Sequence, residues 1–369
     1  MSRKKRLKTT GLSKVNHLYI HIPFCKSKCP YCDFFSVTLA GQKIKDRYTD
    51  ALIKEVKHVS KTLATPLKSF YLGGGNPILI GEINLKKIID AVKPYMSIRT
   101  EKSIEINPEH LGVLDIPSLG FNRVSVGVQT TNKKALKLIK RKYSMQQLIK
   151  NIRTLKGKGV TLSLDFMFAL PGQTIVDLKR DIAFIKRTAP EHVSFYMFTP
   201  PKGYPLKHLL SDDKTIDKMF KLTHSALDKF GFIHYEVSNF AKNKKICRHN
   251  FAYWDKSSYL GLGAGAHSFM SDKRQRMWHG DNVTSYIKAP VTYAGKETLD
   301  KNTRKLEDIM LGLRLLNTGI PTSKIKTDRI KELIKNGIVE VNNKRIKIPA
   351  GKLILLDSII EHICTVSLS

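Results

Sequence analysis

The stretch Tyr19-Ile-His-Ile-Pro-Phe-Cys25-Lys-Ser-Lys-Cys29-Pro-Tyr-Cys32 joins a β-branched and aromatic run to three cysteines in CxxxCxxC spacing. The run that leads into it, from His17 to Ile22, predicts a β-strand. Three thiolates can bind three irons of a [4Fe–4S] cluster and leave the fourth iron without a protein ligand. We therefore predict that Cys25, Cys29 and Cys32 ligate such a cluster.

The open iron of that cluster can chelate the amino and carboxylate groups of S-adenosylmethionine (SAM), whose reductive cleavage yields a 5′-deoxyadenosyl radical. A zinc site is the alternative, and its usual fourth ligand would come from His21 or Cys247. The cysteine spacing, with Tyr31 before the last cysteine, favours the cluster.

Short apolar runs alternate with segments of helical spacing, such as Ile44–Val56 and Thr174–Arg187. This alternation argues for a parallel sheet of βα units, either a partial (β/α)6 barrel or a doubly wound sheet. We expect the partial barrel. The expected strands are His17–Ile22, Ser69–Leu72, Ser103–Ile106, Arg123–Val128, Thr161–Met167 and His192–Phe198.

The pattern along the chain predicts four parts. We expect a basic, disordered tail over residues 1–16, the α/β barrel over 17–211, a connecting α+β region over 212–302 and a C-terminal domain over 303–369. The last part reads as helix, helix, β-hairpin and helix, which is typical of a winged-helix-like domain. Its hairpin turn is expected at Asn342-Asn343, because asparagine tolerates positive φ.

Composition indicates a soluble intracellular protein. Hydrophobic residues make up 41% of the 369 residues, and no apolar run approaches the roughly 20 residues that a membrane span needs. Five cysteines, an odd number in a chain without a secretory signal, favour cluster ligation over disulfides. The net charge is 64 − 31 = +33. Its lysines are scattered, so we expect no dedicated nucleic-acid surface.

Polar and glycine residues follow the expected strands at points where a barrel places its active site. Gly73-Gly-Gly75 closes the second strand and would let backbone approach a ligand that a Cβ would exclude. Glu105, Gln129 and Asp165 lie on the third, fourth and fifth strands. Their convergence predicts a ligand site at this end of the barrel.

These motifs resemble the oxygen-independent coproporphyrinogen III oxidase superfamily, and most closely its HemW branch of heme chaperones. The resemblance extends from about residue 17 to residue 363. It rests on the following runs: Tyr19–Cys25, the cysteine triad, Gly73–Pro77, Gly127–Gln129, Leu164-Asp165, Leu170–Thr174, Tyr235–Phe240, Leu260–His267 and the HNxxYW motif His249–Trp254.

The resemblance implies a set of SAM contacts. Gly74 and Gly75 would permit close approach of the methionyl part, Asp165 would accept from ribose hydroxyls, and Arg141 would pair with a carboxylate. Because Arg141 lies in a basic stretch, a solvated helix end is the alternative for it. The implied contacts are Tyr19, Tyr31, Gly74, Gly75, Asn76, Glu105, Gln129, Arg141 and Asp165.

Two positions depart from the family pattern. Asn76 replaces the usual threonine after the glycines, which puts a hydroxyl-mediated contact in doubt although an amide still donates and accepts. Phe34 stands where the oxidases carry a fourth cysteine, two residues after the third. The second departure argues against radical decarboxylation and favours the HemW branch.

If the protein binds heme, His249 of the HNxxYW motif is the first candidate for the iron ligand, with Cys247 as its rival and His267 as a weaker alternative. Tyr253 and Trp254 could stack on the macrocycle. A purely structural role for His249, with hydrogen bonds from its ring, is the competing interpretation, since an isolated histidine is more often structural.

The resemblance implies a heme chaperone that holds a SAM-bound cluster and delivers heme to acceptor hemoproteins. We expect it in the cytoplasm, with its basic surface assisting peripheral association with an anionic membrane. The alternatives are an oxygen-independent coproporphyrinogen III oxidase and a radical SAM enzyme that modifies RNA. The absent fourth cysteine argues against the first and the lack of a recognisable RNA-binding motif against the second.

Overall fold

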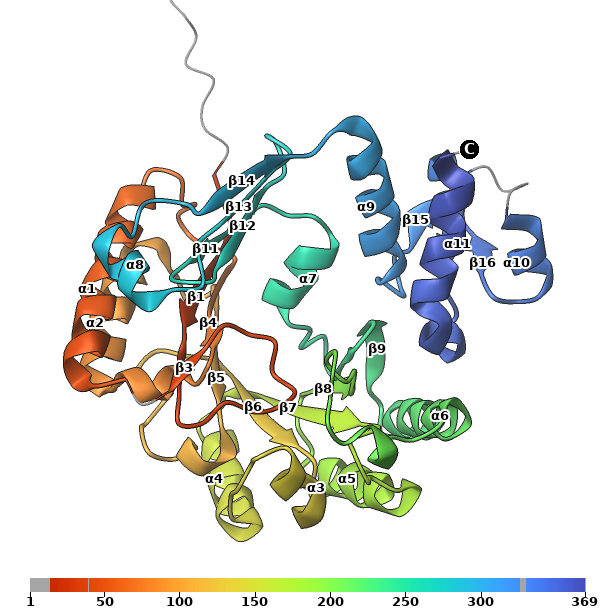
Figure 1. Cartoon of the computed structure of the whole chain (residues 1–369), viewed down its shortest axis with the longest axis horizontal. Coiled ribbons are helices and arrows are strands. Elements are labelled where there is room, and N and C mark those ends of the chain that lie inside the picture. Colours follow the sequence, from red (N-terminus) through yellow and green to blue (C-terminus); the bar gives the residue numbers. More distant parts are fainter. Residues whose placement is uncertain (1–13, 39, 326–329, 369) are drawn as a thin grey trace, which may run out of the picture.

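A computed structural model describes residues 14–38, 40–325 and 330–368. Six parallel strands lie side by side in chain order and form the expected open barrel (Figure 1). They are β1 (His17–Ile22), β4 (Ser69–Gly74), β5 (Glu101–Ile106), β6 (Arg123–Gln129), β7 (Thr161–Phe168) and β8 (His192–Met197). All six fall where the apolar runs predicted strands.

Helices cover the convex side of this curved sheet (Figure 1). They are α1 (Gln42–Val59), α2 (Glu82–Val92), α3 (Lys133–Leu138), α4 (Met145–Gly157), α5 (Ile175–Thr188) and α6 (Asp213–Lys229). α6 packs beside α5, so the barrel's last helix lies beyond the boundary expected at residue 211. Between β5 and β6, where every residue is described, the chain forms only the 3₁₀ turn Pro108–His110 and irregular backbone.

The connecting region does not form a separate layer, because its strands extend both edges of the barrel sheet into twelve strands. β10 (Asn239–Ala241) pairs with β8, and β9 (Ile233–Glu236) follows it. At the other edge β11 (Tyr259–Leu262) pairs with β1 in parallel. The remaining strands at that edge are β12 (His267–Met270), β13 (Gln275–Trp278) and β14 (Gly295–Thr298).

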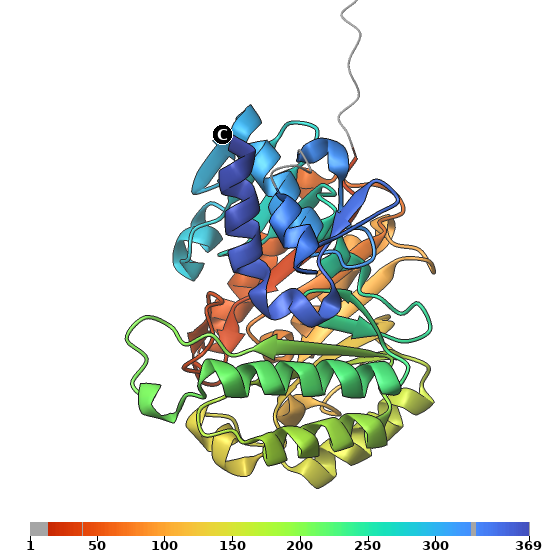
Figure 2. The ribbon, with the colours of Figure 1, turned by 90° about the vertical axis from the view of Figure 1, so that its right-hand side faces the viewer.

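The C-terminal domain has its own apolar core. Its elements are α9 (Lys301–Leu313), β15 (Ile320–Pro321), α10 (Lys331–Lys335), β16 (Glu340–Asn342), β17 (Arg345–Lys347) and α11 (Leu356–Leu368). They follow the expected order, and Figure 2 shows them on the side opposite α5. The hairpin turn is one residue later than predicted, at Asn343-Lys344, where both residues have positive φ. The winged-helix assignment stays a prediction.

The boundary expected for the N-terminal tail, residue 16, lies too far along the chain. Residues 1–13 lie outside the described residues, but Val15 is fully buried and forms a bridge with Leu63. Ordered structure therefore begins before residue 16.

Alternation along β1 sets up the site. Leu18, Ile20 and Ile22 are fully buried in the core between sheet and helices. Because successive side chains of a strand point to opposite faces, His17, Tyr19 and His21 face the concave side. A short helix, α7 (Arg248–Trp254), lies on that concave side (Figure 1).

Candidate functional site

The three cysteines lie in one loop after β1. The loop begins at β2 (Phe24–Cys25) and returns at β3 (Val37–Thr38), and these two segments pair in parallel. Cys32 N donates a hydrogen bond to the Cys29 carbonyl at 3.2 Å. Across the described ranges, no three His, Cys, Asp or Glu side chains converge on one metal ion.

His21 ties the cysteine loop to the barrel. Its Nε2 lies 2.9 Å from the Phe35 carbonyl, and its Nδ1 lies 2.9 Å from the Tyr19 hydroxyl. Because a carbonyl only accepts, Nε2 carries the hydrogen and Nδ1 accepts from Tyr19. Burial lowers the pKa of His21 and keeps the ring neutral. Both nitrogens are thus engaged, and His21 does not serve as the fourth zinc ligand considered above.

The glycines after β4 allow the backbone to pass close to this loop. A Cβ on Gly74, whose φ is +112°, would lie 2.6 Å from the His21 ring. A Cβ on Gly75 would lie 2.7 Å from the Phe24 carbonyl oxygen and 2.9 Å from Cys25 Sγ. Contacts this short do not occur, so both positions require glycine.

Glu105 joins the glycine turn to the barrel interior. Its carboxylate accepts from the Tyr71 hydroxyl at 2.8 Å and from Gly74 N at 3.0 Å. Burial raises the pKa of Glu105 to about 7, against the lowering effect of these two hydrogen bonds, and the nearby charge of Asp165 adds to the rise. The protonation state of this carboxyl therefore changes near neutral pH, where a nearby charge can shift it.

Asp165 lies two strands away from Glu105. Ser125 Oγ lies 2.9 and 2.8 Å from its two carboxylate oxygens. Burial raises the pKa of Asp165, and hydrogen bonds from Ser194, Ser125 and Ser163 oppose that rise. The serine hydroxyls thus hold the carboxylate in one orientation at the concave face.

Gln129 and Arg141 both lie beside Gly127 at the end of β6. The β6–β7 register shifts between Gly127 and Gln129, and Gln129 has a φ of +67°. Such bulges and strained residues commonly occur beside functional sites. Arg141 Nη2 donates to the Gly127 carbonyl at 2.9 Å, whereas its buried Nε has no partner. Arg141 is therefore not the solvated helix end considered above.

Tyr31 anchors the cysteine loop on the opposite side. Its ring packs against the apolar cluster that includes Met167, Leu170 and Phe198. Arg141 is close enough to lower the pKa of Tyr31, although burial raises it more strongly. The loop is thus held between β1 on one side and the ends of β7 and β8 on the other.

The side-chain amide of Asn76 has one hydrogen-bonded atom and one atom without a partner. Its Nδ2 lies 2.8 Å from His110 Nδ1, and its buried Oδ1 has no partner. Buried polar atoms are normally satisfied. Asn76 Oδ1 and Arg141 Nε, one acceptor and one donor, are therefore available to a polar ligand at this end of the barrel.

The helix α7 places the HNxxYW motif against the barrel interior. Its first turn is held by Glu101, which accepts from Arg248 N and His249 N at 3.1 Å each. The His249 ring is 1% exposed and stacks on Tyr71 and Tyr19, with ring centroids 5.1 and 6.1 Å apart. α7 therefore packs directly beneath the residues that hold Glu105 and His21.

Both ring nitrogens of His249 have partners. Nδ1 lies 2.8 Å from Ser69 Oγ, and Nε2 lies 3.0 Å from the Tyr253 hydroxyl. Burial lowers the pKa of His249 to about 3, so the ring is neutral. In this arrangement the ring has no free nitrogen, and iron ligation would require the Tyr253 contact to open.

The two other candidate iron ligands differ in access. Cys247 is buried, and burial raises the pKa of its thiol to about 12. Its Sγ lies 3.7 Å from Glu101 Oε1, at the end of the barrel opposite the cysteine loop. This position removes Cys247 as the fourth zinc ligand. His267 is exposed, stacks on Trp278 with centroids 6.2 Å apart, and lies near enough to influence His21 electrostatically.

The sequence reasoning missed three groups that build this site. Tyr71, Ser125 and Ser69 hold Glu105, Asp165 and His249 in place. All three lie on strands with alternating side-chain directions, and each shares a face with a residue already singled out. This alternation of side-chain directions is the sequence signal that could have identified the three residues.

Comparison with solved structures shows the fold family. The solved structure of coproporphyrinogen III oxidase (HemN) from Escherichia coli, a radical SAM enzyme, matches with a TM-score of 0.81, over 96% of this chain and 90% of that chain. The two sequences are 20% identical, so this likeness concerns the fold. A family model of the radical SAM superfamily matches residues 19–185.

Relatives decide the family. The chain is 32% identical over 362 residues to the heme chaperone HemW of Lactococcus lactis. The aligned region covers 91% of this chain and 93% of that protein. The chain belongs to the HemW family. Its likeness to the heme chaperone HemW of Escherichia coli is also 32%, over 267 residues, 68% of this chain and 69% of that protein.

Membership of the HemW family and the radical SAM superfamily implies a [4Fe–4S] cluster and SAM. The described site fits both groups. It offers three half-buried thiols in one loop, a glycine turn that admits no Cβ, and two unpaired polar atoms.

We predict that Gly75→Ala lowers the iron content of the reconstituted protein at least severalfold. The added Cβ would displace Phe24 and Cys25 at the start of the cysteine loop. Gly157→Ala is the matched control, because a Cβ there meets nothing within 4 Å. Iron and sulfide assays on both variants measure the effect. Equal iron content in the two variants would show that the close approach does not matter.

Proposed function

We propose that the chain is a radical SAM heme chaperone that binds heme and delivers it to acceptor hemoproteins. The observation that carries the proposal is the match to the heme chaperone HemW of Lactococcus lactis, which covers 91% of this chain and 93% of that protein. Phe34, in place of the fourth cysteine that the oxidase pattern carries, supports the same choice.

In this proposal Cys25, Cys29 and Cys32 hold the cluster, which supplies the electron for cleavage of SAM. Glu105 faces the cationic SAM, and Asp165 accepts hydrogen bonds from its ribose hydroxyls. Asn76 Oδ1 and Arg141 Nε, which have no partner within the protein, hydrogen-bond to SAM. The remaining proposed SAM contacts are Tyr19, Tyr31, Gly74, Gly75 and Gln129.

Exposed apolar side chains at the barrel mouth support binding of a flat apolar cargo. Phe34, in the cysteine loop, is 63% exposed, and Tyr196, on the concave side at the end of β8, is 40% exposed. Large exposed apolar residues that gather around a site commonly mark a binding surface. A macrocycle placed between these residues would lie directly over the cysteine loop.

Access favours His267 over His249 as the iron ligand. His267 is exposed beside Trp278, whereas both ring nitrogens of His249 have partners and its Tyr253 contact would first have to open. A neutral imidazole is a common axial ligand of heme iron. We therefore place the cargo at the mouth, with His267 as its ligand and His249 as the support beneath the SAM site.

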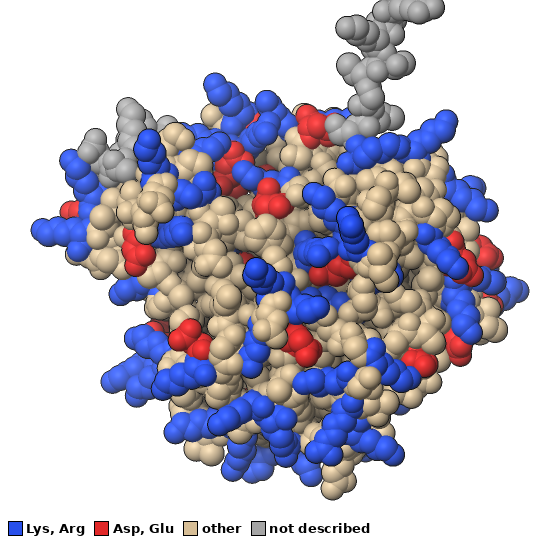
Figure 3. Space-filling view, turned by 180° about the vertical axis from the view of Figure 1, so that it is seen from behind, with Lys and Arg blue, Asp and Glu red and all other residues tan. Residues whose placement is uncertain are grey.

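Charge supports transient contact with anionic partners. Figure 3 shows lysine and arginine spread over the whole visible face with few acidic residues between them. Surface lysines of this kind are attracted to anionic lipid. No helix in the described part of the chain is long and apolar enough to cross a membrane. We propose a cytoplasmic protein that contacts the membrane only peripherally, without a dedicated nucleic-acid surface.

We expect SAM affinity to rise severalfold from pH 6 to pH 7.5. Glu105, with a pKa of about 7, ionises over this range and then attracts the cationic sulfonium ligand. SAM titrations followed by the EPR signal of the reduced cluster measure it. Glu105→Gln should bind SAM weakly and without this rise, whereas Glu82→Gln, at an exposed position of α2, should behave as wild type. A Glu105→Gln profile identical to wild type would remove Glu105 from the site.

Heme titration of the cluster-loaded protein tests the proposed cargo. We expect one heme per chain, with a Soret band that changes in His267→Ala and stays in His249→Ala. The reverse pattern would assign the ligand to His249 and show that α7 opens. No heme binding, together with conversion of coproporphyrinogen III when SAM and a reductant are supplied, would replace the chaperone proposal with the oxidase alternative.

A further inference from the structure

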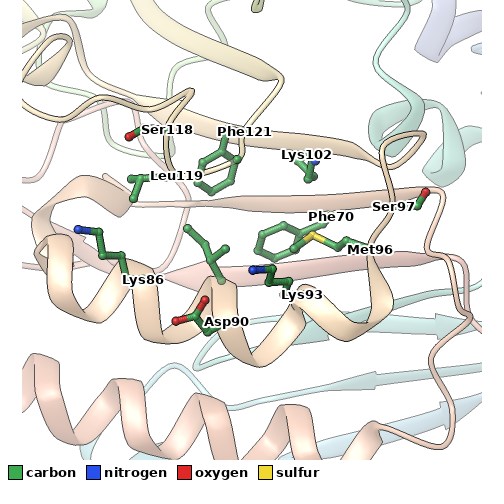
Figure 4. A pocket seen from close by; sticks show the side chains of 12 residues that line it. Phe70, Lys86, Asp90, Lys93, Met96, Ser97, Lys102, Ser118, Leu119 and Phe121 are labelled. Atoms are coloured by element: carbon green, nitrogen blue, oxygen red, sulfur yellow. The ribbon is translucent and has the colours of Figure 1, made fainter.

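A cavity of about 350 Å³ lies on the outside of the barrel, away from the cysteine loop. α2 forms one wall, and the segment at residues 118–121 forms the other (Figure 4). The cavity exists because the connection from β5 to β6 has no α-helix to cover the sheet there. Its volume falls within the range of small-molecule sites.

The floor of the cavity is apolar and aromatic. Phe70 of β4 stacks on Phe121 with ring centroids 6.1 Å apart, and Leu119 lies beside them. Met96 completes this surface, and Figure 4 shows its side chain next to Phe70. Phe70 and Phe121 are buried, so an apolar body in the cavity would contact mainly the half-buried Ile89 and Met96 at its walls and shield them from water.

The rim carries an excess of positive charge. Lys86, Lys93 and Lys102 line the cavity, with Asp90 as the one carboxylate among its lining residues. Lys86 pairs with Glu82 at 2.6 Å. Neither Lys93 nor Lys102 has a carboxylate within ion-pair distance among the residues that the structure describes. Two cationic groups at the edge of an apolar floor complement an anionic ligand with an apolar body.

We infer that this cavity binds an amphipathic carboxylate. The apolar body would lie against Ile89 and Met96, above the buried aromatic floor, and the carboxylate would meet Lys93 and Lys102. Fatty acids and the propionates of porphyrins share this chemistry. The site is distinct from the barrel mouth, because Phe70 and Lys102 point outward from strands whose Tyr71 and Glu105 face the interior.

Fluorescence titration of the full chain with the polyene fatty acid cis-parinaric acid tests the inference, with its methyl ester and metal-free protoporphyrin IX as parallel probes. The double variant Lys93→Gln/Lys102→Gln should weaken binding of the acids by about tenfold. Lys150→Gln, an exposed lysine on α4, should leave it unchanged. Ser118→Trp keeps both charges and should block the cavity sterically.

Saturable binding of either acid that depends on Lys93 and Lys102 and is weaker for the ester supports the inference. The tighter of the two acids then identifies the natural source. Failure of both acids to bind, equal binding of the ester, or unchanged binding in both cavity variants overturns it. Heme titration at the mouth uses different residues, so either proposal can fail while the other stands.

Discussion

The neutral His21 ring is the contact on which the site depends. It accepts from Tyr19 and donates to the Phe35 carbonyl, so it fixes the cysteine loop against β1 while lying directly under Gly74. A side chain at Gly74 would displace the ring, and a charged ring would reverse the direction of the Tyr19 hydrogen bond because both nitrogens would then be donors. Burial prevents that charging by lowering the pKa of His21. The loop, the glycine turn and the strand are therefore one unit.

A second layer beneath this unit gives the HNxxYW motif a structural meaning. Glu101 caps α7, and α7 presses the His249 ring onto Tyr19 and Tyr71. Tyr19 leads to His21 and the cysteine loop, and Tyr71 leads to Glu105 and the glycine turn. A change in α7 thus reaches both halves of the proposed cofactor site through packed rings.

Local patterns predicted what depends on local physics. The six barrel strands and the cysteine loop followed from apolar runs and spacing, and Glu105 and Asp165 do face the concave side. The burial of His249 could not be predicted from the local sequence, because its partners Ser69 and Tyr71 lie about 180 positions earlier in the chain. The same holds for β11, which pairs with β1 across the chain. The absence of an α-helix between β5 and β6 could have been predicted, since residues 107–122 lack helical spacing. The regular alternation of strands and helices in the rest of the barrel led us to expect a helix there as well.

The central claim is that α7 supports the SAM site rather than presenting a free ligand. The most direct measurement is the dissociation constant of SAM, from the EPR signal of the reduced cluster, in His249→Ala and in the neighbouring control Asn250→Ala. The account predicts that removal of the His249 ring weakens SAM binding severalfold, since Tyr19 and Tyr71 lose their stacking partner, while the control binds as wild type. Unchanged SAM affinity in His249→Ala, in a protein that retains its cluster, would contradict it.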